Sequence, residues 1–265
     1  MVLANANRAS FIGTRIVARQ TSPESEYIYQ LIIALYRACK GDWKQLQREA
    51  SISDQSLQGF LEYAAQFLAN GGNYKGFGDS KFIPRVSPEV IEALASLSPG
   101  TKQLLGKTKA GSAGGMYGTA ESPGLMHLGY PDRGHRSSYY PDSENVTEAE
   151  IGAVNDFLAT RALLPENTRL RKLQNGDFEL LIASAIKNPP LEDRDAGDTT
   201  QWTLDGSLKG KKLELVYGDH MEEMARIAVE IKKAGLEAAN DTQKHMMDAY
   251  AKSFGTGSLK SFKGT

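Results

Sequence analysis

The sequence predicts an α+β protein: a mostly helical lobe with a small antiparallel β-sheet or barrel in its second half. Helix-start signals followed by apolar residues at helical spacing occur three times in the first hundred residues. Short apolar runs on both sides of Asn175-Gly176 then indicate strands. Helical patterns return after these strands. This order of helices, strands and helices favours α+β over an alternating βαβ arrangement.

Length and charge limit the classes of partner. The 265 residues are enough for one large domain or two small ones. With 31 basic and 32 acidic residues the net charge is -1, so no overall field attracts nucleic acid or an anionic membrane. The most apolar stretch, residues 27–39, is interrupted by Gln30 and Arg37 and is too short to cross a bilayer. We therefore expect no nucleic-acid partner and no membrane partner.

Two features predict a cytoplasmic location. The first eight residues contain no continuous apolar segment of the kind found in signal peptides. The single cysteine, Cys39, cannot form an internal disulfide, and a cysteine-poor chain suits a reducing compartment. We interpret Cys39 as a small buried residue of a helix, and a Cys–His nucleophile pair stays open as the alternative.

Three helices are predicted in the first half. Ser22-Pro23-Glu24 combines a capping hydroxyl, a proline suited to the first helical position and an acid near the positive helix end. A second helix should follow Ser53 and end at Gly71-Gly72. Ser87-Pro88-Glu89 repeats the first signal and begins the third helix. Residues 1–105 are therefore predicted to form a helical N-terminal region.

Residues 106–126 have a different composition. They are rich in Gly, Ala and Ser and show little periodicity, which predicts a flexible loop. Residues 127–265 should then contain a helix, a β-hairpin region and C-terminal helices.

The elements of this second region follow from local signals. Thr147-Glu148-Ala149-Glu150 is a capping box and begins a helix that should end near Pro165. Strands are predicted on either side of Asn175-Gly176 and at residues 212–217. The remaining predictions are a partner strand at 202–204, a helix capped by Asp219, a last helix over about 241–254, and a tail at 255–265 without an element.

Catalytic motifs are not visible. Gly106-Lys107-Thr108 lacks the earlier glycine and the preceding strand of a phosphate-binding loop. A zinc hydrolase motif needs two histidines one helical turn apart, with a glutamate after the first. The residues that follow the four histidines are Leu128, Arg136, Met221 and Met246. We therefore predict no catalytic residue and no metal ligand, and we interpret His220 beside Glu222 and Glu223 as a solvated helix start.

Residues 70–84 combine several glycines with aromatic and charged side chains. Glycine permits tight backbone turns, and loops of this composition often line a binding surface. Aromatic residues that fill the core beneath a long connection explain the pattern equally well.

Several segments, in order, resemble the dipeptidyl peptidase III family of zinc metallopeptidases. The family segment Gly-Asn-Tyr-Lys-x-Phe-Gly-Asp-x-Lys-Phe is matched by Gly72 through Phe82. Further matches follow in chain order at residues 19–25, 128–131, 134–140, 167–170, 178–184 and 238–240, the last together with Tyr250 and residues 253–254. The resemblance extends from about residue 8 to near the end of the chain.

This resemblance implies a two-lobed zinc exopeptidase that releases dipeptides from the N-termini of oligopeptides bound between its lobes. The family's His-Glu-x-x-Gly-His and Glu-Glu-x-x-x-Glu motifs, which hold zinc, have no counterpart here. We therefore expect one lobe of such a peptidase, inactive alone, without a cofactor of its own, although the full-length family uses zinc. Its expected partners are an oligopeptide in the inter-lobe cleft and a missing C-terminal catalytic lobe. The alternative is a non-catalytic peptide-binding or regulatory module.

The resemblance also implies substrate-binding residues. Phe82, the aromatic of the Lys-Phe pair, is expected to form an apolar wall for the N-terminal residues of the peptide. Its neighbours Asn73, Tyr74, Phe77 and Asp79 are the further candidates.

Overall fold

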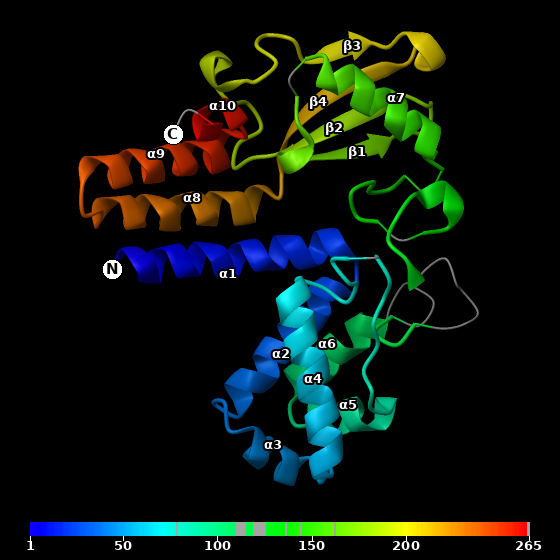
Figure 1. Ribbon diagram of the computed structural model, residues 1–265, viewed down its shortest axis with the longest axis vertical. Coiled ribbons are helices and arrows are strands. Elements are labelled where there is room, and N and C mark those ends of the chain that lie inside the picture. Colours follow the sequence, from blue (N-terminus) through cyan, green and yellow to red (C-terminus); the bar gives the residue numbers. More distant parts are fainter. Residues whose placement is uncertain are drawn as a thin grey trace. The chain divides into compact units, whose positions relative to one another are not determined.

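The computed structural model describes residues 1–77, 79–109, 115–118, 126–135, 137–143, 145–161 and 163–263. Within them lie ten α-helices and one four-stranded sheet, which confirms the α+β class (Figure 1). The helices are α1 (Val2–Thr21), α2 (Ser25–Ala38), α3 (Trp43–Glu49), α4 (Asp54–Asn70), α5 (Pro88–Ala95), α6 (Pro99–Lys109), α7 (Glu148–Ala159), α8 (Met221–Leu236), α9 (Asp241–Thr256) and α10 (Leu259–Lys263). The strands are β1 (Thr168–Lys172), β2 (Phe178–Ala183), β3 (Gln201–Thr203) and β4 (Lys212–Asp219).

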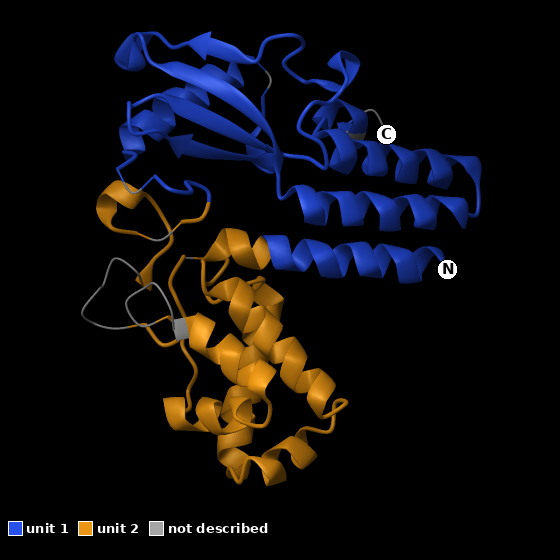
Figure 2. Cartoon of the chain, turned by 180° about the vertical axis from the view of Figure 1, so that it is seen from behind, with its two compact units in different colours: residues 1–16, 139–265 blue, residues 17–138 orange. Residues whose placement is uncertain are grey.

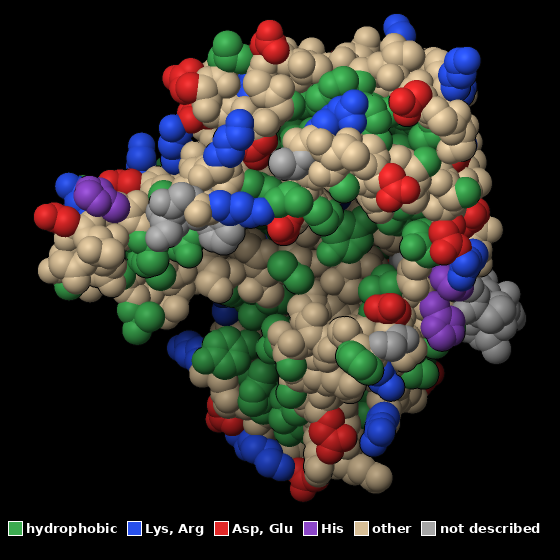
Figure 3. Space-filling model, turned by 45° about the horizontal axis from the view of Figure 1, so that its top comes forward, with side chains coloured by type: hydrophobic (Ala, Val, Ile, Leu, Met, Phe, Trp, Pro, Cys, Tyr) green, Lys and Arg blue, Asp and Glu red, His purple; other side chains and the backbone are tan. Residues whose placement is uncertain are grey.

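The chain forms two compact units (Figure 2). Unit 1 consists of residues 1–16 and 139–265, and unit 2 of residues 17–138. Composition predicted a division of the chain at residues 106–126. The boundaries between the compact units lie elsewhere, after residues 16 and 138. No helix in the described part of the chain is both long and apolar enough to cross a membrane. Acidic and basic side chains are interspersed over the face seen in Figure 3.

Unit 2 is a helical body around one apolar core. Side chains from α2, α4 and α5, including Leu31, Phe67 and Leu94, are fully buried in it. The predicted start and end of α4 are confirmed: Ser53 accepts a hydrogen bond from the Ser56 amide, and Gly71 closes the helix with φ 68°.

Two local predictions in unit 2 need correction. The start expected at Ser22-Pro23-Glu24 lies slightly later, because α2 begins at Ser25, although Ser22 Oγ accepts a hydrogen bond from the Ser25 amide at 3.2 Å as a capping hydroxyl would. The loop expected over 106–126 is wrong for residues 106–109, which complete α6. Leu105 and Thr108 in the last turns of that helix are buried, so packing extends the helix into the glycine-rich stretch. Residues 110–114 and 119–125 of the expected loop lie outside the described residues.

The sheet of unit 1 has the order β1-β2-β4-β3. The predicted hairpin is confirmed, with β1 and β2 antiparallel across Asn175-Gly176 and Gly176 at φ 83°. The antiparallel pair of β3 and β4 is confirmed as well. The sheet is nevertheless mixed. Strand β4 lies between β2 and β3, and it pairs with β3 in antiparallel and with β2 in parallel orientation. The predictions of a fully antiparallel sheet or a barrel are therefore wrong.

One edge of the sheet is covered by the chain itself. The Leu170 amide of β1 donates to the Tyr139 carbonyl at 3.0 Å, and the Lys172 amide donates to Ser143 Oγ at 2.8 Å. Helix α7, which begins with the predicted capping box at Thr147, packs on the sheet, where Phe157 meets Trp202 edge-on. The segment 139–143 thus satisfies outward-facing donors of β1.

The helices of unit 1 form a second apolar cluster. Ile12 and Ile16 of α1 pack with Met224, Ile227 and Ile231 of α8, which places the first 16 residues in the same unit as the C-terminal region.

The cap predicted for α8 is wrong. Asp219 ends β4 and its carboxylate accepts from Arg169 at 2.6 and 2.7 Å, so the N-cap position falls to His220, in a left-handed conformation. The predicted tail also contains an element, since Leu259–Lys263 form α10 and the Leu259 amide donates to Asp195 at 2.7 Å.

Candidate functional site

The segment that carries the resemblance folds as a short hairpin, here called the 73–82 hairpin. The Phe82 amide donates to the Asn73 carbonyl at 3.0 Å, and the Lys75 amide donates to the Ser80 carbonyl at 2.9 Å. Its outer side is bonded to residues 126–128, because the Lys81 amide donates to the Met126 carbonyl at 2.8 Å. The second arm of the hairpin is therefore the middle segment of a small three-segment ladder in unit 2.

Glycines allow the chain to enter this hairpin from α4. Gly71 has φ 68°, a conformation that side chains with a Cβ disfavour. Gly72 lies so close to Thr21 that a Cβ would come within 2.5 Å of its Cγ2 atom. The glycine pair therefore both ends α4 and brings the chain against the helix that precedes α2.

A buried polar network ties the hairpin to the start of α2. Asn73 is fully buried, and its Oδ1 accepts from Ser25 Oγ at 2.7 Å and Ser22 Oγ at 3.1 Å. Its Nδ2 donates to Glu24 Oε1 at 3.3 Å. Buried polar groups need such partners, since an unpaired one costs about 1–3 kcal/mol. Two segments of the family resemblance, 19–25 and 72–82, are thus joined side chain to side chain.

An ion pair lies inside this network. Lys81 Nζ is 2.8 Å from Glu24 Oε1, and the two side chains are 2% and 1% exposed. The same ammonium donates to the Gly115 carbonyl and lies 5.6 Å from the centre of the Tyr74 ring. Since a charge without a partner is costly in a buried position, Glu24 and Lys81 depend on each other.

A tyrosine borders the pair. Tyr63 is buried and meets the Phe82 ring edge-on, with ring centres 5.6 Å apart. Burial raises the pKa of Tyr63 well above its ordinary value, and the negative charge of Glu24 raises it further. Within the part of the chain that the structure describes, its hydroxyl has no hydrogen-bond partner.

The five predicted substrate-binding residues separate into two groups. Asn73, Tyr74 and Phe82 are buried, and Phe82 belongs to the core of unit 2. Phe77 is 97% exposed at the hairpin tip, and Asp79 beside it is exposed with φ 51°. Gly78 lies outside the described residues. The hairpin thus holds three of the candidates inside and presents two outside.

Sequence reasoning missed the ionic centre of the site. Glu24 was interpreted as part of a helix start, and Lys81 as a charged residue between aromatics. Both lie inside segments that match the family pattern, Glu24 in residues 19–25 and Lys81 in residues 72–82. The presence of an acid in one matched segment and a lysine in another is the signal that could have suggested their pairing.

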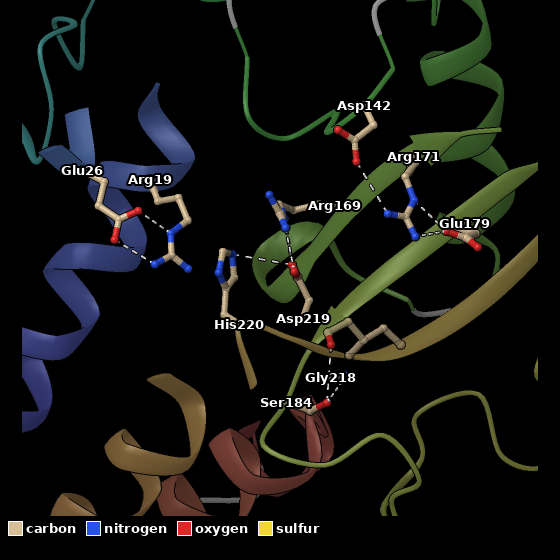
Figure 4. Close-up of polar contacts among 11 residues, drawn as sticks. Arg19, Glu26, Asp142, Arg169, Arg171, Glu179, Ser184, Gly218, Asp219 and His220 are labelled. Carbon is tan, nitrogen blue, oxygen red and sulfur yellow. Dashed lines mark hydrogen bonds and ion pairs between the residues drawn. The ribbon is translucent and has the colours of Figure 1, made fainter. Parts of the chain in front are cut away.

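A second polar cluster lies in unit 1. Figure 4 shows Arg169 and His220 turned toward the carboxylate of Asp219, and His220 Nε2 lies 3.6 Å from Asp219 Oδ2. Ser184 Oγ accepts from the Gly218 amide at 2.8 Å. These contacts fix the ends of β1, β2 and β4. In the part of the chain that the structure describes, the Ser184 hydroxyl bonds to backbone groups of Ile186 and Gly218 and not to a histidine that could act as its base.

The other sequence candidates are structural. Cys39 is buried in the core of unit 2, which confirms its interpretation as a small buried residue, but it lies at the C-cap of α2 and not inside the helix. Among the described residues no group of three or more His, Cys, Asp or Glu side chains is close enough to hold a metal. These residues therefore do not fit the three-ligand site of a catalytic zinc.

Comparison with known proteins agrees with the resemblance. The model of a family described as Peptidase family M49 matches residues 112–265. Dipeptidyl peptidase 3 from Homo sapiens is 32% identical and matches 97% of this chain with 35% of its own length. Dipeptidyl peptidase 3 from Dictyostelium discoideum is also 32% identical, over 96% of this chain and 34% of its own. The chain thus spans about a third of the length of these curated relatives. A family model that matches more than half of the chain and relatives that match nearly all of it lead to one conclusion: the chain belongs to peptidase family M49.

Proposed function

We propose that this chain is the N-terminal, peptide-binding lobe of a zinc-dependent exopeptidase that releases dipeptides from the N-termini of oligopeptides. Membership of family M49 supports the reaction class. The observation that carries the role of this chain is the 73–82 hairpin, which presents the Phe77 ring 97% exposed on a backbone anchored by buried polar contacts.

An exposed phenylalanine on an anchored hairpin suits contact with a peptide. Burying its ring against an apolar side chain gains about 1.5–3 kcal/mol. Phe82, proposed as an apolar wall, offers only 8% of its surface, so Phe77 supplies the larger contact. Asp79 adds a charge beside Phe77, and Asn73 and Tyr74 hold the hairpin from beneath.

Zinc and the groups that act on the scissile bond are assigned to a C-terminal catalytic lobe, which we propose as the partner of this chain. When bound there, zinc lowers the pKa of its water and polarises the carbonyl of the substrate. The residues of this chain bind and orient the oligopeptide in the cleft between the two lobes.

A fluorescent oligopeptide with apolar residues at its first two positions tests peptide binding. We expect saturable binding below millimolar peptide, weakened roughly tenfold or more by Phe77→Ala through the lost apolar contact. Phe11→Ala is the matched control, because Phe11 is a partly exposed phenylalanine outside the hairpin. A signal that does not saturate at millimolar peptide would refute the proposal.

The same preparation distinguishes a non-catalytic peptide-binding module from an enzyme. Because the described residues hold no three-ligand cluster, we expect no release of a dipeptidyl-arylamide when zinc is added to the chain alone. Turnover that requires added zinc would overturn the assignment of the catalytic groups to another lobe.

A further inference from the structure

Three segments of unit 2 meet at the ammonium group of Lys81. Glu24 directly precedes α2, and Gly115 lies in a turn at residues 115–118. Lys81 itself lies in the second arm of the hairpin, next to Phe82. One side chain therefore connects the hairpin with two distant parts of the chain.

The hairpin has little to hold it in place by itself. Among its described residues, two backbone hydrogen bonds join its arms, from the amides of Lys75 and Phe82. Its tip contains Gly76 and a non-glycine residue at positive φ, Asp79. An isolated two-stranded hairpin is marginally stable at best, so its conformation must be fixed by contacts outside it.

A buried ion pair is an unusual means of supplying such contacts. Apolar residues of similar size often stabilise a fold equally well or better at a buried position. What the pair adds is register, because a slip of one residue turns every side chain of a strand to the opposite face. A slip would carry the Lys81 ammonium away from Glu24 and leave both charges buried without each other.

We infer that Glu24 and Lys81 are positioning residues of the peptide-binding hairpin. Their ion pair selects the register that buries Tyr74 and Phe82 and turns Phe77 outward, and Asn73 completes the selection through its bonds to Ser25 and Glu24. The inference rests on the proposed function only for the effect on peptide affinity; the effect on the hairpin is independent of it.

The first measurement reports the hairpin tip without any peptide. A nitroxide attached through Phe77→Cys gives an electron paramagnetic resonance spectrum of tip mobility, and Cys39 is too buried to be labelled in the folded chain. We expect a faster-moving label in Glu24→Gln, which keeps the size of the side chain, and in the double variant Glu24→Leu with Lys81→Met. Lys75→Met is the matched control, since Lys75 is an exposed lysine of the same hairpin, and it should leave the spectrum unchanged.

The double variant separates positioning from stability. Because it removes both charges, its melting temperature should stay close to that of the parent chain. We nevertheless expect its tip to be mobile and its peptide affinity, measured with Phe77 in place, to fall roughly tenfold or more. A double variant with an immobile tip and unchanged affinity would show that the ion pair is only structural and would overturn the inference.

Failure of the proposed function has a different signature. If the parent chain binds no peptide while the label still becomes mobile in Glu24→Gln and the double variant, the positioning role stands and the peptide-binding role falls. A label that stays immobile in both variants contradicts the positioning role, whatever the peptide does.

Discussion

Tyr63 shows at the scale of one residue how a buried polar atom can be tested. Its hydroxyl is buried beside the Glu24–Lys81 pair, and no described residue hydrogen-bonds it. We expect Tyr63→Phe to raise the free energy of unfolding by up to about 1 kcal/mol, because it removes an unsatisfied group and keeps the ring. Urea denaturation monitored by circular dichroism measures the change.

Tyr117→Phe is the control for this prediction. The Tyr117 hydroxyl donates to the Val86 carbonyl at 3.1 Å, so its loss should lower the free energy of unfolding by about 1 kcal/mol. A comparable loss in Tyr63→Phe would contradict the assignment of an unsatisfied hydroxyl.

The residues of the site were only partly predictable. Asn73, Tyr74, Phe77, Asp79 and Phe82 were selected because their segment matches a family pattern. Glu24 is separated by 57 positions from Lys81, and a local pattern carries no information about such a pair. The local sequence favoured a helix start at Ser22-Pro23-Glu24. In the folded chain, Ser22 and Glu24 of this segment instead contribute to the buried polar network around Asn73.

At the scale of elements, the start of α7 responds to acid. Burial raises the pKa of Glu150, but hydrogen bonds from Lys172 and Thr147 and the positive charge of Lys172 together lower it by more, so the net pKa lies below its ordinary value. A carboxyl group with a lowered pKa stabilises the fold above its unfolded-state pKa, and this contribution is lost as the pH falls through the folded-state value.

We therefore expect Glu150→Gln to lower the free energy of unfolding at neutral pH and to have little effect in strong acid. Chemical denaturation between about pH 3 and pH 7 measures the difference, because the ordinary pKa of glutamate is about 4.3. Asp156→Asn in the same helix is the control, and an equal effect of Glu150→Gln at both ends of this range would contradict the prediction.

Helix α9 offers a pair of glycines with opposite expectations. Gly257 has φ 81°, and a Cβ there would come within 2.9 Å of Ile182 Cγ2 and 3.1 Å of the Ala183 carbonyl oxygen. We expect Gly257→Ala to lower the free energy of unfolding by about 1–3 kcal/mol. Gly255, inside the helix, has open space around it, so Gly255→Ala should be neutral or stabilising by up to about 1 kcal/mol. Thermal melting of both variants tests this contrast, and equal melting temperatures would refute it.

Elements with strong local signals were predicted well. The β1–β2 hairpin, the capping box of α7 and the limits of α4 each depend on residues a few positions apart. The parallel pairing of β2 with β4 was missed. It depends on which edge of β4 pairs with β3, and local sequence does not determine that edge. Helices α1, α3, α6 and α10 were also missed, because no start signal was recognised before any of them, although Asp42 caps α3.

At the scale of the molecule, each unit has its own apolar core. Phe67 is fully buried in unit 2 and Phe178 is 1% exposed in unit 1. We expect Phe67→Ala to cost about 3–5 kcal/mol and to speed hydrogen exchange mainly in residues 17–138. Phe178→Ala should act mainly on residues 139–263. Mass spectrometry of the exchanged peptides checks this, and acceleration of both sets by either substitution would indicate a single cooperative body.

The grouping of the first 16 residues with the C-terminal region could not be derived from composition. Ala9, Ile12 and Ile16 reach partners more than 150 positions later, in β2, α8 and α9. The family, in contrast, was identified from ordered motifs, and the relatives that match nearly the whole chain confirm it.

The strip of chain along β1, residues 139–143, restricts the addition of a further strand at that edge of the sheet. The outward amides of Leu170 and Lys172 are already engaged by Tyr139 and Ser143, so an incoming strand would have to displace that strip before it could bond. A strand contributed by another polypeptide could therefore pair along β1 only after that strip had left. The strip thus opposes fibre-like polymerisation, since endless addition of copies requires that both edges of a sheet be available for pairing.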